Sequence, residues 1–227
     1  MTDPQDQRST RRDYHDNQLS VYDLASDPLE QFTRWLEAAI AADAIDATAM
    51  ALSTAAISAS EDHKRPQAIP SIRIVLLKHF DADGFCWYSD YRSQKGVELS
   101  DNPIASALFY WHESERQVRI TGMVEKLSPA ESEKYFYDRP VDSRFAAAAS
   151  KQSAVIESRS ALEARLAELE KEYPDGNVPM PHAWGGYRLR PREYEFWQGR
   201  EGRLHDRFRF ARPAAGASHW KVERLQP

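Results

Sequence analysis

The sequence predicts an α+β fold that is mainly β, with a barrel-type antiparallel sheet of roughly seven or eight strands and a few peripheral helices. Short apolar or alternating runs separated by polar turns recur along the chain, which is typical of antiparallel strands. Helix-start signals occur at only a few places. No GxGxxG follows a strand, and GxxxxGK[ST], HExxH and GxSxG are all absent, which excludes a Rossmann fold and these common catalytic motifs.

The composition indicates an ordinary globular protein. The chain has 227 residues, 41% of them hydrophobic, and a net charge of −5 that argues against general nucleic-acid binding. Its one cysteine, Cys86, excludes an internal disulfide and a cysteine-based metal cluster, and we expect it to be a small buried side chain with no metal bound. No apolar run reaches the ~20 residues of a membrane helix, and the N-terminus is too polar for a secretory signal. We therefore expect a cytoplasmic protein without a membrane partner.

The chain divides into a tail and one domain. Residues 1–20 are polar, charged and without periodicity, and we expect them to be a mobile segment. Residues 21–227 are expected to form a single domain. Its first helix begins at Asp27, a capping residue followed by Pro28. The apolar stripe of this helix is Leu29, Phe32, Leu36 and Ile40.

Strands are expected over residues 49–57, 71–80, 84–90, 104–111, 117–127, 184–190, 193–197, 203–212 and 219–225. A hairpin turn is expected at Asp81–Gly84. Within the second strand, Arg73 and Lys78 lie at the ends of an apolar run, which is a poor place for unpaired charge.

Serine residues mark the starts of three later helices. Ser93 can cap a short helix that ends before Pro103, and the first amides of that helix would be available to an anion such as phosphate. Capping boxes at 128–131 and 160–163 open two more helices. The second of these is expected to bury a stripe made of Leu162, Leu166, Leu169 and Tyr173. The segment 139–153 fits either a helix or a loop.

The run YEFWQGREGRLHDRF, residues 194–208, combines aromatic residues, glycines, arginines and a histidine, which folding alone does not require. Residues 194–197 suit a strand and 198–202 a turn. If the next residues are extended, Arg203, His205 and Arg207 leave one face of a strand. Two interpretations fit their charge: a face that binds an anion, or a solvated strand edge with Glu201 and Asp206 as salt-bridge partners.

This run, WQG followed by RLHDR, resembles the C-terminal signature of the pyridoxamine 5′-phosphate oxidases. Other segments resemble motifs of that family in the family order, and the resemblance covers nearly the whole chain from Asp27 to Pro227. They are RIVLLK at 73–78, RQVRITG at 116–122, YFYDRPVDS at 135–143, SKQS at 150–153, WGGYR at 184–188 and the terminal VERLQP. Each motif is weak alone, but independent motifs rarely coincide at family-like spacings.

The resemblance implies an FMN-binding split β-barrel with peripheral helices, whose C-terminal region, about 184–227, takes part in a homodimer with two FMN sites at the interface. It also implies a reaction of vitamin B6 metabolism. Pyridoxamine or pyridoxine 5′-phosphate would pass a hydride from C4′ to flavin N5, and dioxygen would reoxidise the flavin, giving pyridoxal 5′-phosphate and hydrogen peroxide.

The resemblance further implies which residues form the site. Those binding FMN would be Arg73, Ile74, Val75, Leu76, Leu77, Lys78, Tyr88, Ser89, Lys95, Gln117, Gln152, Ser153, Trp197 and Arg207. Those binding the substrate phosphate would be Lys78, Tyr135, Arg139 and Ser143, while Arg11 and Tyr14 would belong to a segment that covers the substrate. The catalytic residues would be Arg203 and His205, lying over the pyridine ring, with His205 either a hydrogen-bond partner or a proton acceptor.

Residue chemistry is consistent with that assignment. Two phosphate esters require two cationic groups, and arginine binds phosphate through two hydrogen bonds at once. Tyr135, Arg139 and Ser143 are spaced four apart, so they would share one face if the segment is a single helix. A solvated helix face with a capping serine is the alternative interpretation of these three residues.

Two departures from the family pattern affect the cofactor site. Gln94 stands where the family usually has arginine, and FAAAAS at 145–150 replaces the usual IGAWAS and its tryptophan. Weaker FMN binding is therefore expected. A related flavin oxidase of secondary metabolism, of the phenazine type, is an alternative function that the substrate-phosphate residues argue against. A non-catalytic FMN- or pyridoxal-phosphate-binding protein is another, which the presence of Arg203 and His205 disfavours.

Overall fold

The computed structural model describes residues 14, 18–58, 67–212 and 219–227. The chain forms two compact units. The first unit is Met1–Ala47, Leu108–Ile120 and Glu193–Pro227, and the second is Thr48–Ala107 and Thr121–Arg192. Strands β5 (Ile104–Trp111), β6 (Arg116–Lys126) and β7 (Trp184–Gln198) contribute residues to both.

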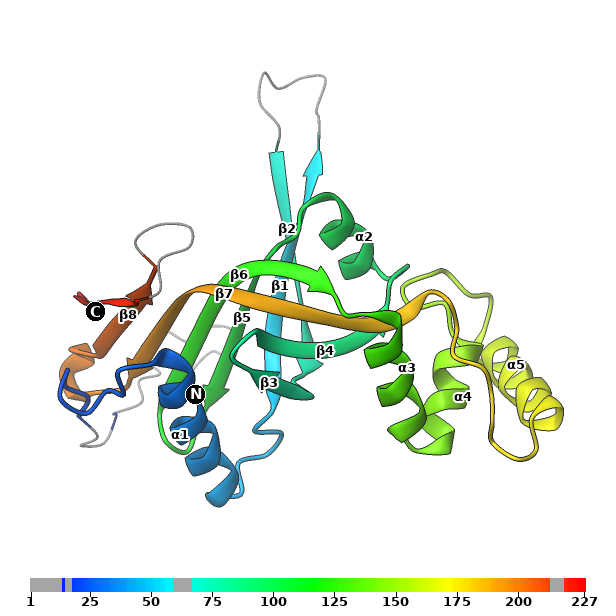
Figure 1. The fold of residues 1–227 in the computed structure, drawn as a ribbon, viewed down its shortest axis with the longest axis horizontal. Coiled ribbons are helices and arrows are strands. Elements are labelled where there is room, and N and C mark those ends of the chain that lie inside the picture. The colour runs from blue at the N-terminus through cyan, green and yellow to red at the C-terminus, as the bar shows by residue number, and fades with distance from the viewer. Residues whose placement is uncertain (1–13, 15–17, 59–66, 213–218) are drawn as a thin grey trace, which may run out of the picture. The chain divides into compact units, whose positions relative to one another are not determined.

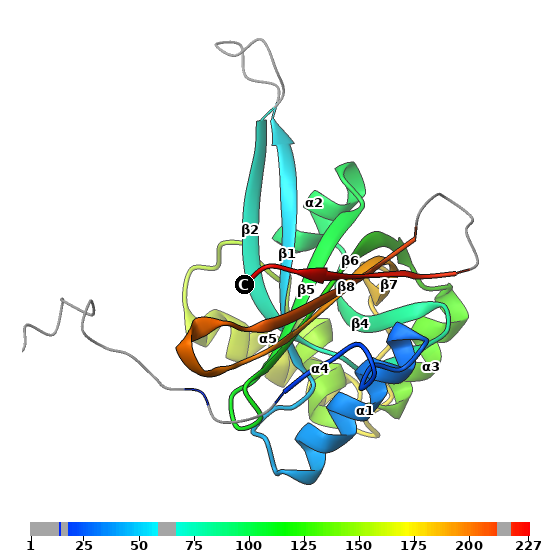
Figure 2. The same cartoon turned by 90° about the vertical axis from the view of Figure 1, so that its left-hand side faces the viewer.

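The second unit is built on an antiparallel sheet. Its other strands are β1 (Ala49–Ser58), β2 (Gln67–Leu76), β3 (His79–Asp81) and β4 (Gly84–Asp90). The strand order is β2-β1-β5-β6-β7-β4-β3, so β2 is an edge strand. Strands β1 and β2 pair over their full length, from Ala49 opposite Leu76 to Ser58 opposite Gln67, and extend past the other strands of this unit (Figures 1 and 2).

Helices of the second unit gather beyond one end of β4 and β7, except for α2 (Gln94–Asp101), which lies near β1 (Figure 1). They are α3 (Pro129–Asp138), α4 (Val141–Ala149) and α5 (Arg159–Glu172). A small core joins them to β7: Phe136, Phe145, Val178 and Trp184 are buried, and Leu166, Leu169 and Tyr173 of the α5 region pack against this core. These contacts fix α3 and α4 beside the end of β4, where site residues are expected.

The first unit contains helix α1 (Pro28–Ala41), the short 3₁₀ helix η1 (Glu201–Arg203) and strands β8 (Asp206–Ala211) and β9 (Lys221–Leu225). Strand β8 pairs with residues 193–198 of β7 on one side and with β9 on the other. Aromatic contacts form its core, with Trp35 edge-on to Phe196 at 5.3 Å and Phe32 against Phe109 at 5.0 Å between ring centroids.

The structure confirms the α+β, mainly β class and most element starts. Asp27, Ser93 and Ser128 cap α1, α2 and α3 as predicted, and Ser128 with Glu131 forms the predicted capping box. The hairpin turn lies between Asp81 and Gly84, where the φ of Gly84 is +142°. None of the helices in the described part of the chain is long and apolar enough to cross a membrane.

Some predicted boundaries are wrong. The strand predicted at 71–80 is two strands, because the Leu77 amide still bonds to Thr48 while the Lys78 amide bonds to Cys86 of β4. Residues 184–198 form one strand, not two. Helix α5 is capped by Ser158, so no capping box begins at Ser160, and its predicted stripe is only half-buried.

The structure also tests the predicted buried stripe of α1 and the ambiguous segment 139–153. Ile40, predicted to be in the buried stripe of α1, is 53% exposed, and Trp35 and Ala39 are buried instead. The ambiguous segment 139–153 contains helix α4 followed by a loop.

Candidate functional site

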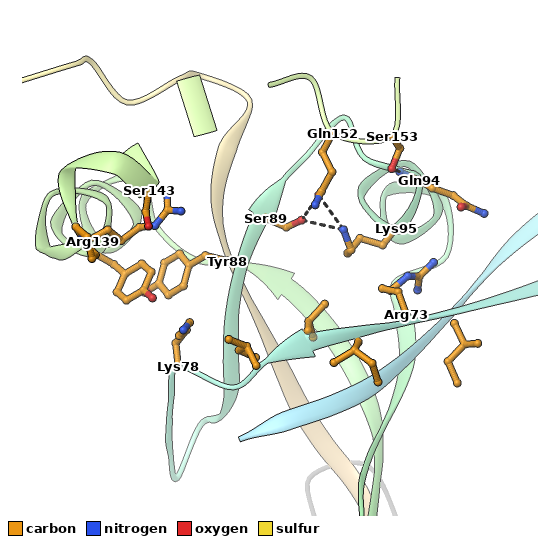
Figure 3. Close-up of a pocket in the computed structure, with 16 residues that line it drawn as sticks. Arg73, Lys78, Tyr88, Ser89, Gln94, Lys95, Arg139, Ser143, Gln152 and Ser153 are labelled. Atoms are coloured by element: carbon orange, nitrogen blue, oxygen red, sulfur yellow. Dashed lines mark hydrogen bonds between the residues drawn. The ribbon is translucent and has the colours of Figure 1, made fainter. Parts of the chain in front are cut away.

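The second unit contains a cavity of about 750 Å³ that gathers most of the predicted site. Strands β2 and β4, helix α2, the α3–α4 junction and the loop after α4 all contribute to it. The predicted residues that line it are Arg73, Ile74, Val75, Leu76, Lys78, Tyr88, Ser89, Lys95, Tyr135, Arg139, Ser143, Gln152 and Ser153. Figure 3 shows its labelled polar side chains in two groups, one around Lys95 and one around Arg139.

Lys95 is the centre of the first group. Its side chain is on the first turn of α2 and is only 6% exposed. The ammonium donates to Ser89 Oγ at 3.0 Å and Gln152 Oε1 at 2.9 Å (Figure 3). It also donates to Ser93 Oγ at 3.2 Å. Burial, and then the nearby charge of Arg73, lower the pKa of Lys95 from its usual value. An anion in the cavity would therefore meet a cation that is already desolvated and held in place.

Arg73 reaches the same group from β2 and is paired with a buried carboxylate. Its Nη2 lies 3.2 Å from Glu98 Oε2, and its Nη1 donates to Thr54 Oγ1 at 2.5 Å. Burial would raise the pKa of Glu98, but hydrogen bonds from Ser71, Thr54 and Gln94 and the Arg73 charge together hold it below its usual value. Arg73 is thus not an unpaired charge in an apolar strand.

Glu98 was not predicted as a site residue. The available signal was its position one helical turn after Gln94, since residues four apart share a helix face. In the structure, Gln94 Nε2 donates to Glu98 Oε1 at 3.0 Å, so Gln94 uses its amide on this carboxylate.

The N-terminus of α2 faces the loop after α4. The backbone N–H of Gln94 donates to Ser153 Oγ at 3.2 Å, and Ser153 has a φ of +67°, a left-handed conformation that a serine adopts only under constraint. The loop is also tied to β4, because Gln152 N–H donates to Asp90 Oδ2 at 3.4 Å. These contacts hold two predicted cofactor residues, Gln152 and Ser153, against the start of a helix, where an anion is favoured.

The second group surrounds Arg139 at the junction of α3 and α4. The Arg139 guanidinium lies 4.9 Å from the Trp184 ring centroid, and its buried Nη1 has no hydrogen-bond partner among the described residues. Burial lowers the pKa of Arg139 from its usual value. The rings of Tyr88 and Tyr135 stack at 3.8 Å beside it, and burial raises the pKa of both.

The condition for a shared helix face, a single helix over 135–143, is not met, although the members of this second group do line one cavity. Tyr135, Arg139 and Ser143 do not share one helix face, because α3 ends at Asp138 and Arg139 is its C-terminal cap. Pro140 then precedes α4, which carries Ser143. The break between helices, rather than a helical repeat, brings the three residues to the same cavity.

Other predicted cofactor residues lie in the first unit. Gln117, Trp197 and Arg207 line a separate cavity of about 270 Å³ together with Glu195. Glu195 is 6% exposed and was not predicted; it accepts from Arg207 Nε at 2.9 Å and from Arg119. Leu77, predicted among the cofactor residues, is buried and lines neither cavity.

The predicted catalytic residues lie in the loop between β7 and β8. His205 is half-buried, with its ring 4.6 Å from Trp197 and 5.1 Å from Tyr14 between centroids. Arg203 is exposed and has a φ of +62°. Because η1 ends at Arg203 and β8 begins at Asp206, the prediction that Arg203, His205 and Arg207 share a strand face is wrong. Arg11 lies outside the described residues.

Two family models match the chain. Residues 29–173 match the model described as "Pyridoxamine 5'-phosphate oxidase", and residues 184–227 match "Pyridoxine 5'-phosphate oxidase C-terminal dimerisation region". The chain is 47% identical over 226 residues to a pyridoxine/pyridoxamine 5′-phosphate oxidase of Prochlorococcus marinus, covering 98% of this chain and 97% of that one. A protein of the same name from Herminiimonas arsenicoxydans is 48% identical over 217 residues, covering 96% and 97%.

Solved structures give the same fold. PhzG from Burkholderia lata 383, in complex with tetrahydrophenazine-1-carboxylic acid, superposes with a TM-score of 0.80 at 34% identity, covering 91% of this chain and 95% of that one. A pyridoxamine 5′-phosphate oxidase-related, FMN-binding protein from Nostoc punctiforme, 17% identical with a TM-score of 0.66, covers 90% of this chain and all of that one. Because its identity is only 17%, the Nostoc punctiforme protein shows a shared fold and nothing more.

Proposed function

This chain belongs to the pyridoxamine 5′-phosphate oxidase family, and we propose that it oxidises pyridoxamine or pyridoxine 5′-phosphate to pyridoxal 5′-phosphate with FMN as cofactor. When bound, FMN supplies the hydride-accepting chemistry of the reaction, and dioxygen is the proposed final acceptor, with release of hydrogen peroxide. The substrate is a small molecule, and the protein acts as a homodimer. The proposed location is the cytoplasm, without nucleic acid or membrane as partners.

One observation carries this proposal: a single cavity presents two separate cationic groups, as a phosphorylated cofactor and a phosphorylated substrate require. Lys95 and Arg73, with Gln152 and Ser153, would hold the FMN phosphate beside the first turn of α2. The desolvated ammonium of Lys95 and the nearby helix N-terminus both suit a phosphate.

The second group would hold the substrate phosphate. Arg139 supports this assignment, because a buried guanidinium N–H without a protein acceptor among the described residues is costly and a phosphate oxygen would satisfy it. Lys78, in the connection between β2 and β3, would add a positive charge, and Ser143 of α4 would add a hydroxyl donor. The stacked rings of Tyr88 and Tyr135 would exclude water from one side of the phosphate.

The homodimer requires an apolar surface, and the edge strand β2 offers one. Ile72, Ile74 and Leu76 alternate along it and are 69%, 66% and 41% exposed, so all three leave the same face of the strand. Exposed apolar residues in a row on an edge strand are typical of an interface. These side chains also line the cavity, which supports cofactor sites that are completed at the subunit interface.

The proposed reaction can be tested without oxygen. The protein is reconstituted with FMN, pyridoxine 5′-phosphate is added anaerobically, and the flavin absorbance is followed. We expect the flavin to bleach and then to recover, with pyridoxal 5′-phosphate formed, when air is admitted. A flavin that binds but stays oxidised with both the amine and the alcohol substrate would contradict the proposal.

The likeness to PhzG favours a second candidate function, a flavin oxidase acting on a non-phosphorylated ring system. A carboxylate on such a ring could also accept from the Arg139 Nη1, so the oxidised substrate distinguishes the two candidates. Bleaching of the bound flavin by pyridoxine 5′-phosphate, and not by tetrahydrophenazine-1-carboxylic acid, is expected for the first candidate, and the reverse for the second.

We expect this protein to bind FMN more weakly than a family member with arginine in place of Gln94. Replacing Gln94 with arginine should lower the dissociation constant for FMN by about 3- to 10-fold, because a second arginine would face the phosphate and share Glu98. Flavin fluorescence quenching on titration of the apoprotein measures this. The matched control is Gln67→Arg, the same change at an exposed position of β2 that does not line the cavity. Equal dissociation constants for the wild type and Gln94→Arg would refute the prediction.

A further inference from the structure

Arg73 and Glu98 are joined directly and also through two hydroxyl groups. Arg73 Nη2 lies 3.2 Å from Glu98 Oε2. The Thr54 hydroxyl accepts from Arg73 Nη1 at 2.5 Å and donates to Glu98 Oε2. The Ser71 hydroxyl accepts from Arg73 Nη2 and lies 2.8 Å and 2.6 Å from the two Glu98 carboxylate oxygens, to which it can donate. Three connections therefore hold this guanidinium against this carboxylate.

These contacts occupy the end of the guanidinium that could bind a phosphate through two hydrogen bonds. Arg73 Nη1 donates to the Leu52 carbonyl oxygen at 3.1 Å and to Thr54, and Nη2 donates to Ser71 and Glu98. Each terminal nitrogen thus has at least two protein acceptors, and a phosphate oxygen could replace one of them. Glu98 is the only charged acceptor among them, so it is the strongest competitor of a phosphate for Arg73.

The Glu98 carboxylate is enclosed by protein and stays charged. It is 5% exposed and also accepts from Gln94 Nε2 at 3.0 Å. Burial alone would raise the pKa of Glu98, but its hydrogen bonds and the Arg73 charge hold that pKa below the usual value. Because Gln94 is neutral, Arg73 is the only cation that donates to Glu98 within the described part of the chain.

The charges at this end of the cavity are only partly matched to a phosphate. Arg73 and Lys95 bring two positive charges, and both side chains lie at the same end of the cavity in Figure 3. Glu98 offsets one of them. Asp90, another carboxylate near Lys95, is paired with Arg92 at 2.6 Å. A phosphate monoester carries a charge of about −1.5 to −2 at pH 7, so it meets less positive charge than it could bind.

We infer that Glu98 limits the affinity of the cavity for the phosphate group of FMN, because it occupies Arg73 and offsets its charge. The inference rests on the proposed placement of that phosphate beside Lys95 and Arg73, but not on the reaction that the protein catalyses. Glu98 is a positioning residue in this arrangement, since it acts on the ligand through Arg73. Its effect is confined to the phosphate, so it sets how strongly the protein distinguishes FMN from riboflavin.

The test replaces Glu98 with glutamine, which removes the charge and keeps a similar shape. The full-length apoprotein is titrated with FMN and with riboflavin, and flavin fluorescence gives the two dissociation constants. We expect the constant for FMN to fall about 5- to 20-fold in Glu98→Gln, and that for riboflavin, which has no phosphate, to stay within about twofold. An FMN constant that is unchanged or higher would overturn the inference, and so would an equal fall for both ligands.

The matched control is Asp101→Asn. This change removes a negative charge from the same helix, α2, at an exposed position that does not line the cavity. Both dissociation constants should stay within about twofold of the wild type. If Asp101→Asn strengthens FMN binding as much as Glu98→Gln does, the effect is one of overall charge and the inference fails.

A second variant decides the question if Glu98→Gln does not fold, as judged by far-UV circular dichroism. Glu98→Asp keeps the charge but withdraws the carboxylate from Arg73 by one methylene group. We expect the dissociation constant for FMN to fall about 2- to 5-fold, again with little change for riboflavin. No fall in this variant would overturn the inference.

Inorganic phosphate gives a measurement that involves no flavin. A ligand that binds only the folded protein raises the midpoint of thermal unfolding, and it does so more when it binds more tightly. At one phosphate concentration, the midpoint should rise more for Glu98→Gln apoprotein than for the wild type or Asp101→Asn. Equal rises in the three proteins would count against any competition between Glu98 and phosphate and would overturn the inference.

Failure of the inference can be told apart from failure of the proposed site. If the wild type binds FMN no more tightly than riboflavin, the phosphate is not bound in this cavity, and the proposed cofactor site fails together with the inference. If the wild type prefers FMN and Glu98→Gln leaves that preference unchanged, the inference alone fails. Neither result depends on substrate oxidation, which the anaerobic bleaching of the flavin tests separately.

Discussion

Replacing Arg139 with alanine should raise the KM for pyridoxine 5′-phosphate by about 10- to 100-fold, with a smaller change in kcat. A hydrogen bond to a charged group is worth about 1.5–3 kcal/mol, and each 1.4 kcal/mol is a factor of ten. The Arg139 Nη1 is buried without a partner among the described residues, so its contribution is available to the substrate. Steady-state kinetics with FMN in excess measure the effect.

The control for this variant is Arg144→Ala. Arg144 is an arginine on the adjoining helix α4, near the Tyr137 ring, and does not line the cavity. Its KM should stay within about twofold of the wild type, because no phosphate contact is removed. If Arg139→Ala and Arg144→Ala behave alike, the substrate phosphate is not bound at the α3–α4 junction.

Replacing Gly122 with alanine should destabilise the fold by about 3 kcal/mol or more. Gly122 is in β6, and a Cβ there would lie 1.9 Å from the Arg190 carbonyl oxygen and 3.0 Å from Pro191 Cα. Both are backbone atoms of β7, which cannot move aside without breaking the pairing between the two strands. The midpoint of urea denaturation, with the slope, gives the change in free energy of unfolding.

Gly202→Ala is the matched control for this prediction. Gly202 has a φ of +61°, but a Cβ at this position would meet no described atom within 4 Å. Only the conformational cost of a left-handed alanine applies, roughly 1 kcal/mol. A loss at Gly122 no larger than that at Gly202 would show that β7 yields to the added methyl group.

The proposed cofactor and substrate residues were predicted mainly from motifs in the sequence, whereas the geometry that brings them together is a property of the tertiary structure. The segment 150–153 is an example: its motif predicted Gln152 and Ser153, but not that Ser153 takes a left-handed conformation and meets the first amide of α2. That contact joins residues 59 positions apart, which no local pattern encodes.

The sequence did not allow the buried carboxylates of the site to be predicted. Glu98 and Glu195 are 5% and 6% exposed, yet in the sequence they are indistinguishable from solvated acids. A carboxylate is stable in the interior only where cations and hydroxyl groups converge on it from other elements. Arg73 and Ser71 do so for Glu98, and Arg207 and Arg119 for Glu195.

The α+β class, the caps of the first helices and the family motifs could be predicted from the sequence, because they depend on neighbouring residues and on the alternation of side chains along strands. The arrangement of the candidate site could not, because it depends on contacts between residues far apart in the chain. The chain breaks between α3 and α4 at Arg139 and Pro140, and this break brings Tyr135, Arg139 and Ser143 to the same cavity. The Arg200 N–H donates to His205 Nδ1, a contact that exists only once the loop between β7 and β8 has folded.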